Sequence, residues 1–325
     1  MQTYRGQKRE MHLHGAGDYY HLSIKVASLF QKRYCLLTNS GTSAIEIVCE
    51  VLEISNKTIY TSNYHWPGAI APFLKRNNKI FVGKADQNFS LNVNDLAQYS
   101  PDVVLAVDFL GIAHSNQKII GGYCKEKSLV YLTDACSSMG TKQNNSFSTG
   151  YYSDVVVTSF GPQKSFYGGE GGAILTNSEQ IFEACLYFIE HPYRHIAEGI
   201  EKNYYSTNQR MNPFGIKYLL NHFNKELDDL RKRQVRGFAY YSLLMEKGII
   251  RSESPEYTIE NCVYQKLAID AGKNTKNFRD YFVFQQIPSL LKFNIPLYLK
   301  QQGEMIYTKE SEEDPVRTFL ITERF

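Results

Sequence analysis

Short apolar runs rich in β-branched residues alternate with longer amphipathic segments over roughly the first half of the chain. Runs of four or five such residues are typical of strands, whereas apolar residues at every third or fourth position are typical of helices. The pattern predicts strands at Tyr34–Leu37, Thr58–Thr61, Lys79–Val82, Val103–Val107, Leu129–Leu132, Asp154–Thr158 and Ala173–Leu175. It predicts helices between several of them, at Ser43–Leu52, Pro67–Arg76 and Asn116–Lys127.

This alternation predicts an α/β fold, with a mostly parallel sheet covered by helices on both faces and ligands bound at the carboxyl ends of the strands. The order changes after the last of these strands. A helix is followed there by a polar connector (His191–Thr207), a long charged helix (Gly215–Glu246), short strands and a helix near Asn274–Gln286. We therefore expect a large domain with an N-terminal arm at 1–220 and a smaller α+β domain at 221–325.

The composition is that of an ordinary soluble globular protein, with 43% hydrophobic and 21% charged residues. A net charge of +3 and the lack of a basic helix-turn-helix segment indicate no nucleic-acid partner, although an anionic small substrate is compatible with the charge. We find no signal peptide and no apolar stretch of roughly 20 residues, so we expect no membrane contact. The six cysteines form neither a CxxC pair nor a cluster with histidines. We expect reduced thiols, no metal and a cytoplasmic location.

The segment "TNSGTSAIEIV" (Thr38–Val48) places hydroxyl residues and a glycine between a predicted strand and a predicted helix. The main-chain N–H groups at a helix N-terminus, together with the helix dipole, bind anions such as phosphate. Gly41, Thr42 and Ser43 are therefore candidate phosphate-binding residues. The alternative is a plain N-cap, since serine and threonine also cap helices that bind nothing.

Two further candidates follow predicted strands. Trp66 is the only tryptophan and lies in "TSNYHWPGA" (Thr61–Ala69), where its ring could stack on a flat heteroaromatic ligand or belong to the core. Asp134 ends an apolar run in "LVYLTDACSSMG" (Leu129–Gly140). A carboxylate at this depth is costly unless it is paired. It could bond to a protonated ring nitrogen, or it could cap the next helix.

The segment "SFGPQKSFYGGEGGAILT" (Ser159–Thr176) holds one lysine among glycines, directly before an apolar run. An exposed loop lysine is the simple interpretation. If Lys164 is instead held away from water as a neutral amine, it becomes a nucleophile toward an aldehyde. The glycines would let the backbone approach a ligand closely.

Together these segments supply an anion site, a stacking surface, an acid for a ring nitrogen and a lysine for an aldehyde. These are the four features that pyridoxal 5′-phosphate (PLP) requires of a protein. They occur in this order, each just after a predicted strand, so the parallel sheet should bring them together. The sequence therefore predicts a PLP site.

In several motifs the chain resembles the DegT/StrS aminotransferases, which are sugar aminotransferases of PLP fold type I. The matching motifs are "NSGTSAIE", "DFLGIAHSN", "TDACSS", "SFGPQKSFYGGEGGAILTN" and "STNQRMNPF". The resemblance implies that Lys164 forms the Schiff base with PLP, that Asp134 holds the proton on the ring nitrogen and that Trp66 stacks on the ring. It also implies that the backbone at Gly41–Ser43 and the Ser159 hydroxyl bind the phosphate.

The resemblance further implies a homodimer with shared active sites, in which Asn208 reaches the phosphate of the neighbouring subunit. Arg210 is expected to stabilise the local fold or the interface. The family usually has glutamine or histidine where this chain has Ser137, so we expect the corresponding contact with cofactor or substrate to be shortened or lost. Threonine is common in the family where this chain has His65. Both ends of the chain are shorter than in the family, so we expect a helix fewer at each.

The activity implied is a PLP-dependent transfer of an amino group from glutamate or glutamine to the keto group of a sugar. The acceptor is usually nucleotide-linked, in amino-sugar, polysaccharide or antibiotic biosynthesis. One alternative is a ketone without a nucleotide, such as an inosose or a small keto compound. Another is a PLP lyase or dehydratase on the same scaffold. Sugar dehydratases of this kind typically carry histidine in place of the lysine, and Lys164 argues against that alternative.

Overall fold

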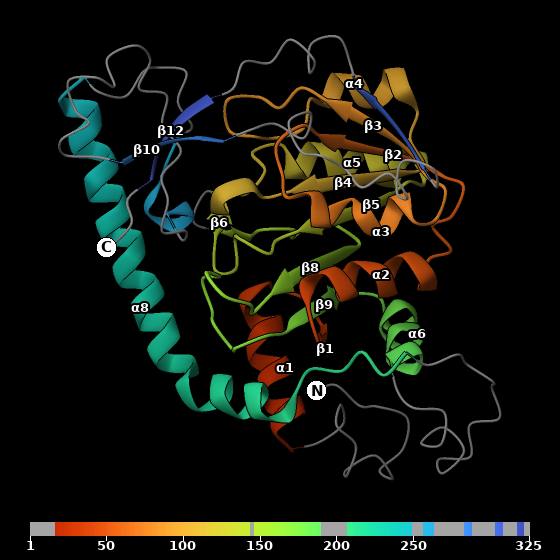
Figure 1. The fold of residues 1–325 in the computed structure, drawn as a ribbon, viewed down its shortest axis with the longest axis horizontal. Helices are drawn as coiled ribbons and strands as arrows, with labels where there is room; N and C mark the ends of the chain where they lie inside the picture. Colours follow the sequence, from red (N-terminus) through yellow and green to blue (C-terminus); the bar gives the residue numbers. More distant parts are fainter. Residues whose placement is uncertain are drawn as a thin grey trace.

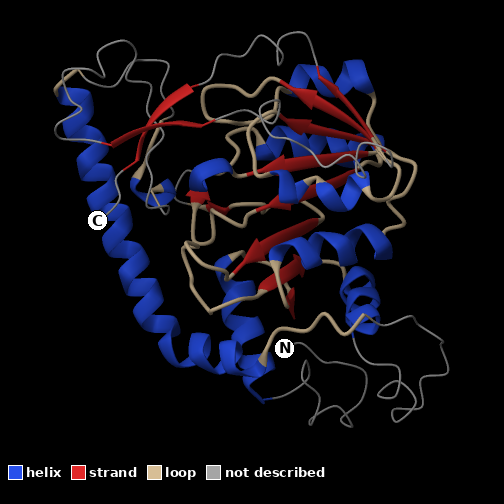
Figure 2. Ribbon diagram, viewed as in Figure 1, coloured by secondary structure: helices blue, strands red, loops and turns tan. Residues whose placement is uncertain are grey.

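The computed structural model describes residues 17–143, 146–189, 207–248, 256–262, 283–287, 303–307 and 317–321. These residues form an α/β fold in which one large sheet lies between two layers of helices (Figures 1 and 2). Only the backbone of 283–287 and 317–321 is described. The predicted fold class is confirmed.

The large sheet has eight strands in the order β1-β9-β8-β5-β4-β2-β3-β11. β9 runs antiparallel to both of its neighbours, and all other neighbouring strands are parallel. The strands are β1 (Tyr34–Thr38), β2 (Thr58–Ser62), β3 (Lys79–Gly83), β4 (Val103–Val107), β5 (Val130–Asp134), β8 (Val155–Ser159), β9 (Gly172–Thr176) and β11 (Glu304–Tyr307). The seven predicted strands therefore lie within two residues of their expected limits.

Helices cover both faces because alternate residues of each strand point to opposite sides. In β4, Leu105 packs in the core cluster beneath α2, α3 and α6, whereas Val104 and Ala106 pack beneath α4 and α5. α1 and α8 continue the second layer over β1, β8 and β9. The helices of the two layers are α2 (Gly41–Val51), α3 (Ala71–Leu74) and α6 (Glu179–Ile189) on one face, and α1 (Gly17–Leu29), α4 (Val93–Tyr99), α5 (Gln117–Lys127) and α8 (Pro213–Glu246) on the other.

Helix α8 begins beside α1 and extends along one side of the molecule (Figure 1). Asn212 caps it by accepting the N–H of Phe214 at 2.8 Å, and Pro213 takes its first position, where no N–H is needed. The helix crosses residue 220, where we placed the domain boundary, without a break. β11 comes from the predicted small domain yet adds to the edge of the large sheet beside β3. The division into domains stays a prediction.

Three expectations need correction. The helix expected near Asn274–Gln286 is wrong in its last part, since Val283–Ile287 is a strand (β10) that pairs antiparallel with β12 (Arg317–Ile321). The helix expected at Pro67–Arg76 is divided into η2 (Pro67–Ala69) and α3. Proline fits only the first turn of a helix, so Pro72 starts a new one. The first strand–helix junction also differs, because α2 begins at Gly41 rather than at the expected Ser43. Of the connector expected at His191–Thr207, only Thr207 lies within the described residues.

All six cysteines carry free thiols, and five of them are buried. Cys136 is the exception and is only partly covered. In the described ranges, no helix combines the length and the apolar composition needed to cross a bilayer.

Candidate active site

A cavity of about 600 Å³ opens at the carboxyl ends of β4, β5 and β8. This is the place where open α/β sheets bind ligands, because parallel strands end at one edge. Most of the predicted site residues line it: Gly41, Thr42, Trp66, Asp134, Ser137, Ser159 and Lys164. Ser43 and Asn208 are not part of its wall. The structure thus brings four separate sequence segments to one cavity.

The first turn of α2 forms one wall of the cavity. Ser40 is the N-cap: its hydroxyl oxygen accepts the N–H of Ser43 at 3.0 Å and lies 2.9 Å from the Ser43 hydroxyl. This explains why Ser43 turns to the cap rather than to the cavity. A Cβ at Gly41 would lie 2.7 Å from Cys136 Sγ, so glycine lets the helix begin this close to the chain after β5. Gly41 and Thr42 place the positive end of the helix dipole at the cavity, where it favours an anion.

Trp66 lies just after β2 and precedes η2. Its side chain is not in the core: the residue is 71% exposed and lines the cavity. The alternative of a core tryptophan is therefore wrong. An indole with an exposed face can stack on a flat ring.

Asp134 is the last residue of β5 and is buried, with 7% exposure. Its Oδ1 accepts the N–H of Cys136 at 2.9 Å. Burial raises the pKa of the Asp134 carboxyl, and the contacts with Cys136 and the charge of Lys164 oppose that shift. The chain continues from 135 to 140 without a helix, so the alternative that Asp134 is a helix cap is wrong.

Lys164 is half-buried in the loop between β8 and β9. Its N–H donates to Gly161 O at 3.3 Å, which closes a tight turn. At the base of the loop, the Ser159 hydroxyl accepts the N–H of Gly161 at 3.3 Å and donates to Gly171 O at 3.4 Å. The charge of Lys164 acts on Asp134 across the cavity. Lys164 and Asp134 both line the cavity.

A sequence profile of the DegT/DnrJ/EryC1/StrS aminotransferase family matches residues 17–319. The chain belongs to this family. The family resemblance predicted from the sequence motifs is thereby confirmed.

Two curated relatives of this chain have names that refer to sugars. It is 28% identical over 223 residues to the 3-oxo-glucose-6-phosphate:glutamate aminotransferase of Bacillus subtilis, a match that covers 66% of this chain and 46% of that protein. It is 24% identical over 195 residues to the GDP-perosamine synthase of Escherichia coli O157:H7, covering 57% of this chain and 52% of that one. The chain thus matches about half the length of these relatives.

Solved structures agree with the family fold. The E. coli GDP-4-keto-6-deoxy-D-mannose-3-dehydratase with bound hydrated PLP has a TM-score of 0.79 at 15% identity, covering 95% of this chain and 88% of that one. A DegT DnrJ EryC1 StrS aminotransferase from Brucella abortus has a TM-score of 0.78 at 17% identity, with coverage of 95% and 86%. At these identities the likeness shows the fold alone.

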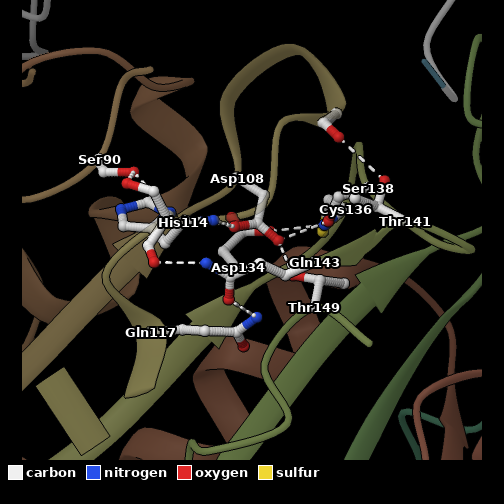
Figure 3. Close-up of polar contacts among 12 residues, drawn as sticks. Ser90, Asp108, His114, Gln117, Asp134, Cys136, Ser138, Thr141, Gln143 and Thr149 are labelled. Carbon is white, nitrogen blue, oxygen red and sulfur yellow. Dashed lines mark hydrogen bonds and ion pairs between the residues drawn. The ribbon is translucent and has the colours of Figure 1, made fainter. Parts of the chain in front are cut away.

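One buried acid, Asp108, was not among the site residues predicted from the sequence. Asp108 directly follows β4 and is 1% exposed. Its Oδ1 accepts the N–H of His114 at 3.2 Å and lies 3.1 Å from the Nδ1 of the same ring. Its Oδ2 accepts the hydroxyls of Ser138, at 2.6 Å, and Thr149 (Figure 3). The N–H of Asp108 donates to Asp134 O at 3.0 Å. Asp108 thus ties the end of β4 to the segment that carries Asp134.

We expect Asp108→Ala to lower the free energy of unfolding by about 3–5 kcal/mol. The substitution leaves several buried hydrogen-bond donors without an acceptor, and each such donor costs roughly 1–3 kcal/mol. Urea denaturation measures the change. The control is Glu126→Ala, which removes an exposed carboxylate whose partner is Lys127 and should leave the midpoint unchanged. A loss below about 1 kcal/mol would show that the Asp108 network does not hold the strand ends together.

Asn208 lies outside the cavity, on a segment that runs beside the end of β1. Arg210 forms a bridge with Thr38, and Asn39 N–H donates to Gln209 O at 2.9 Å. The Asn208 side chain is exposed, and its Oδ1 accepts from Arg210 Nε at 3.1 Å and Nη2 at 2.6 Å. Arg210 thus joins this segment to β1 through its main chain and contacts Asn208 through its side chain. The carboxamide N–H groups of Asn208 are not used in this contact and can donate elsewhere.

Proposed function

We propose that the protein is a PLP-dependent aminotransferase that moves an amino group from glutamate or glutamine to the keto group of a sugar. The observation that carries this proposal is the meeting of Lys164, Asp134, Trp66 and the first turn of α2 around one cavity. Family membership supports the reaction class. The names of the curated relatives support a sugar acceptor.

The residues present fit PLP. Gly41 and Thr42, at the start of α2, and the Ser159 hydroxyl would hold its phosphate, since a helix N-terminus favours an anion. Trp66 would cover one face of the ring, and Lys164 would bind its aldehyde carbon. Asp134 uses Oδ1 for Cys136, and its carboxylate would bond to the ring N–H in a charge-assisted contact. Ser137, where the resemblance implies a longer glutamine or histidine, lines the same cavity.

When bound, PLP supplies an electron-poor ring that stabilises negative charge at the α-carbon of the amino donor. Asp134 keeps the proton on the ring nitrogen, because its carboxylate favours the charged form of that ring. The amine of Lys164 would take a proton from the α-carbon of the amino donor as general base and return one as general acid. Trp66 excludes water from one face of the ring.

Asn208 is proposed to act across a two-fold homodimer. It is exposed and outside its own cavity, and Arg210 holds its Oδ1 so that its N–H groups can point to an anion elsewhere. We propose that Asn208 of the partner subunit donates to the phosphate. Each active site would then need both subunits.

The test is a screen of donors and acceptors on the purified protein loaded with PLP. Glutamate or glutamine should change the visible absorbance of the cofactor, and a keto sugar should restore it and appear as an amino sugar by mass spectrometry. The panel holds nucleotide-linked ketosugars, a keto sugar phosphate and free inososes. Amination of inososes alone would contradict the sugar acceptor. Release of ammonia or pyruvate without transfer would indicate a lyase or dehydratase instead.

A further inference from the structure

His65 is buried directly beside the exposed Trp66. The residue is 1% exposed; its Nδ1 lies 3.1 Å from Trp66 O and its Nε2 lies 3.4 Å from Thr61 Oγ1. Thr61 belongs to β2 and is itself fully buried. Because a carbonyl oxygen only accepts, we assign the proton of the neutral ring to Nδ1. The histidine therefore links the main chain at Trp66 to the end of a core strand.

We propose that His65 is a positioning residue for Trp66: it holds the main chain so that the indole keeps one face toward the cavity. This inference rests on the proposed function, in which the ring of PLP stacks on that indole. The family resemblance leads one to expect threonine at this position, where this chain has His65. Its role is indirect, since it contacts Trp66 rather than the cofactor.

Gly68 defines the other side of the indole. A Cβ at Gly68 would lie 2.9 Å from Cδ1 and 3.0 Å from Nε1 of Trp66, and 3.7 Å from Thr42 Oγ1. The indole therefore lies against the backbone at Gly68, close to the first turn of α2. His65 restrains the main chain and Gly68 leaves space for the ring. Together they give a 71% exposed side chain a definite orientation.

The hydrogen bond between His65 and Trp66 O involves the neutral form of the histidine. Burial lowers the pKa of His65 to about 4, and main-chain contacts with Trp66 and Ser62 oppose the shift. In the described part of the chain no charged side chain contributes to it. If the segment opened to water, His65 would have its ordinary pKa of about 6.5. Between pH 6.5 and 4 the open state therefore binds more protons than the closed state. The restraint on Trp66 should hold at neutral pH and weaken as the pH falls through this range.

The single tryptophan makes the restraint measurable without a label. We would record time-resolved fluorescence anisotropy of the cofactor-free protein, excited selectively at the indole. At neutral pH, His65→Ala should add a fast depolarisation component that the parent lacks. His65→Asn should remain like the parent, since its amide can donate to Trp66 O from near the Nδ1 position. Circular dichroism and gel filtration confirm that each variant is folded.

Two further comparisons separate positioning from a general loss of structure. In acid, the parent should gain the fast component between pH 6.5 and 4, and His65→Asn should not, because an amide does not titrate. Gly68→Ala should also displace the indole and alter its anisotropy. Its matched control is Gly122→Ala on α5, where a Cβ would meet nothing within 4 Å.

A second experiment measures the dissociation constant of PLP from the quenching of the Trp66 emission. His65→Ala should raise it about tenfold, and His65→Asn should leave it close to that of the parent. Equal anisotropy in the parent and His65→Ala would overturn the proposal. So would increased mobility with unchanged PLP affinity, because the held orientation would then not serve the cofactor. If the parent itself does not bind PLP, the proposed function fails, and the anisotropy still decides whether His65 holds Trp66.

Discussion

Lys164→Ala should abolish covalent attachment of PLP and reduce amino transfer by more than about 10³-fold. The variant loses both the amine that binds the aldehyde and the group that moves the proton, and general acid–base catalysis alone contributes roughly 10²–10⁴-fold. Borohydride reduction followed by peptide mapping should place the label on Lys164 in the parent and nowhere in the variant. The visible absorbance of the bound cofactor should change with it.

The control is Lys118→Ala, which removes an exposed lysine on α5. It should keep the label, the absorbance and the rate of the parent. Label on another side chain in the parent, or unchanged turnover in Lys164→Ala, would contradict the assignment. Thermal unfolding of the cofactor-free proteins should be similar for both variants, because Lys164 is only half-buried.

Asp134→Asn should retain covalently bound PLP but lose about 10²–10³-fold in the rate of amino transfer. Asparagine can still accept the N–H of Cys136, which keeps the local fold. It carries no charge, so it does not hold the proton on the ring nitrogen, and removal of one preorganised electrostatic partner costs this much in other enzymes. Single-turnover kinetics with glutamate measure the loss.

Asp134→Ala separates charge from hydrogen bonding at the same position. It should lose at least as much rate as Asp134→Asn and also lower stability, since the N–H of Cys136 loses its acceptor. Transfer at the parental rate in either variant would show that Asp134 is only structural. Borohydride labelling of Lys164 in both variants confirms that the cofactor is still bound.

The sheet and most of the cavity wall could be predicted from the sequence for one shared reason. Strands buried on both faces form continuous apolar runs, and the polar residue that ends such a run lies at the carboxyl edge of a parallel sheet. Asp134 was found in this way, and Gly41, the first residue of α2, follows another such run. Ser159 was implied by the family resemblance. The helix expected near Asn274–Gln286 is wrong in its last part, where Val283–Ile287 forms a strand, because a short apolar run fits either periodicity.

Asp108 also ends an apolar run, but it was not predicted as a site residue. It too is an acid directly after an apolar run, in "DFLGIAHSN". Its partners come from Ser138 and Thr149, which lie 30 and 41 residues away in the chain. Such separations are invisible in a local pattern, so the role of Asp108 depends on tertiary packing.

The sequence alone determined the seven strands between residues 34 and 176, the chemical types of the candidate residues and the family. These follow from local periodicity and from motifs within single segments. Only the tertiary structure decided that Ser40 caps α2, that Ser43 and Asn208 lie outside the cavity and that His65 is buried against Trp66. Burial, hydrogen-bond partners and the direction of a side chain are set by neighbours that are distant in the chain, and they exist only once the sheet has formed.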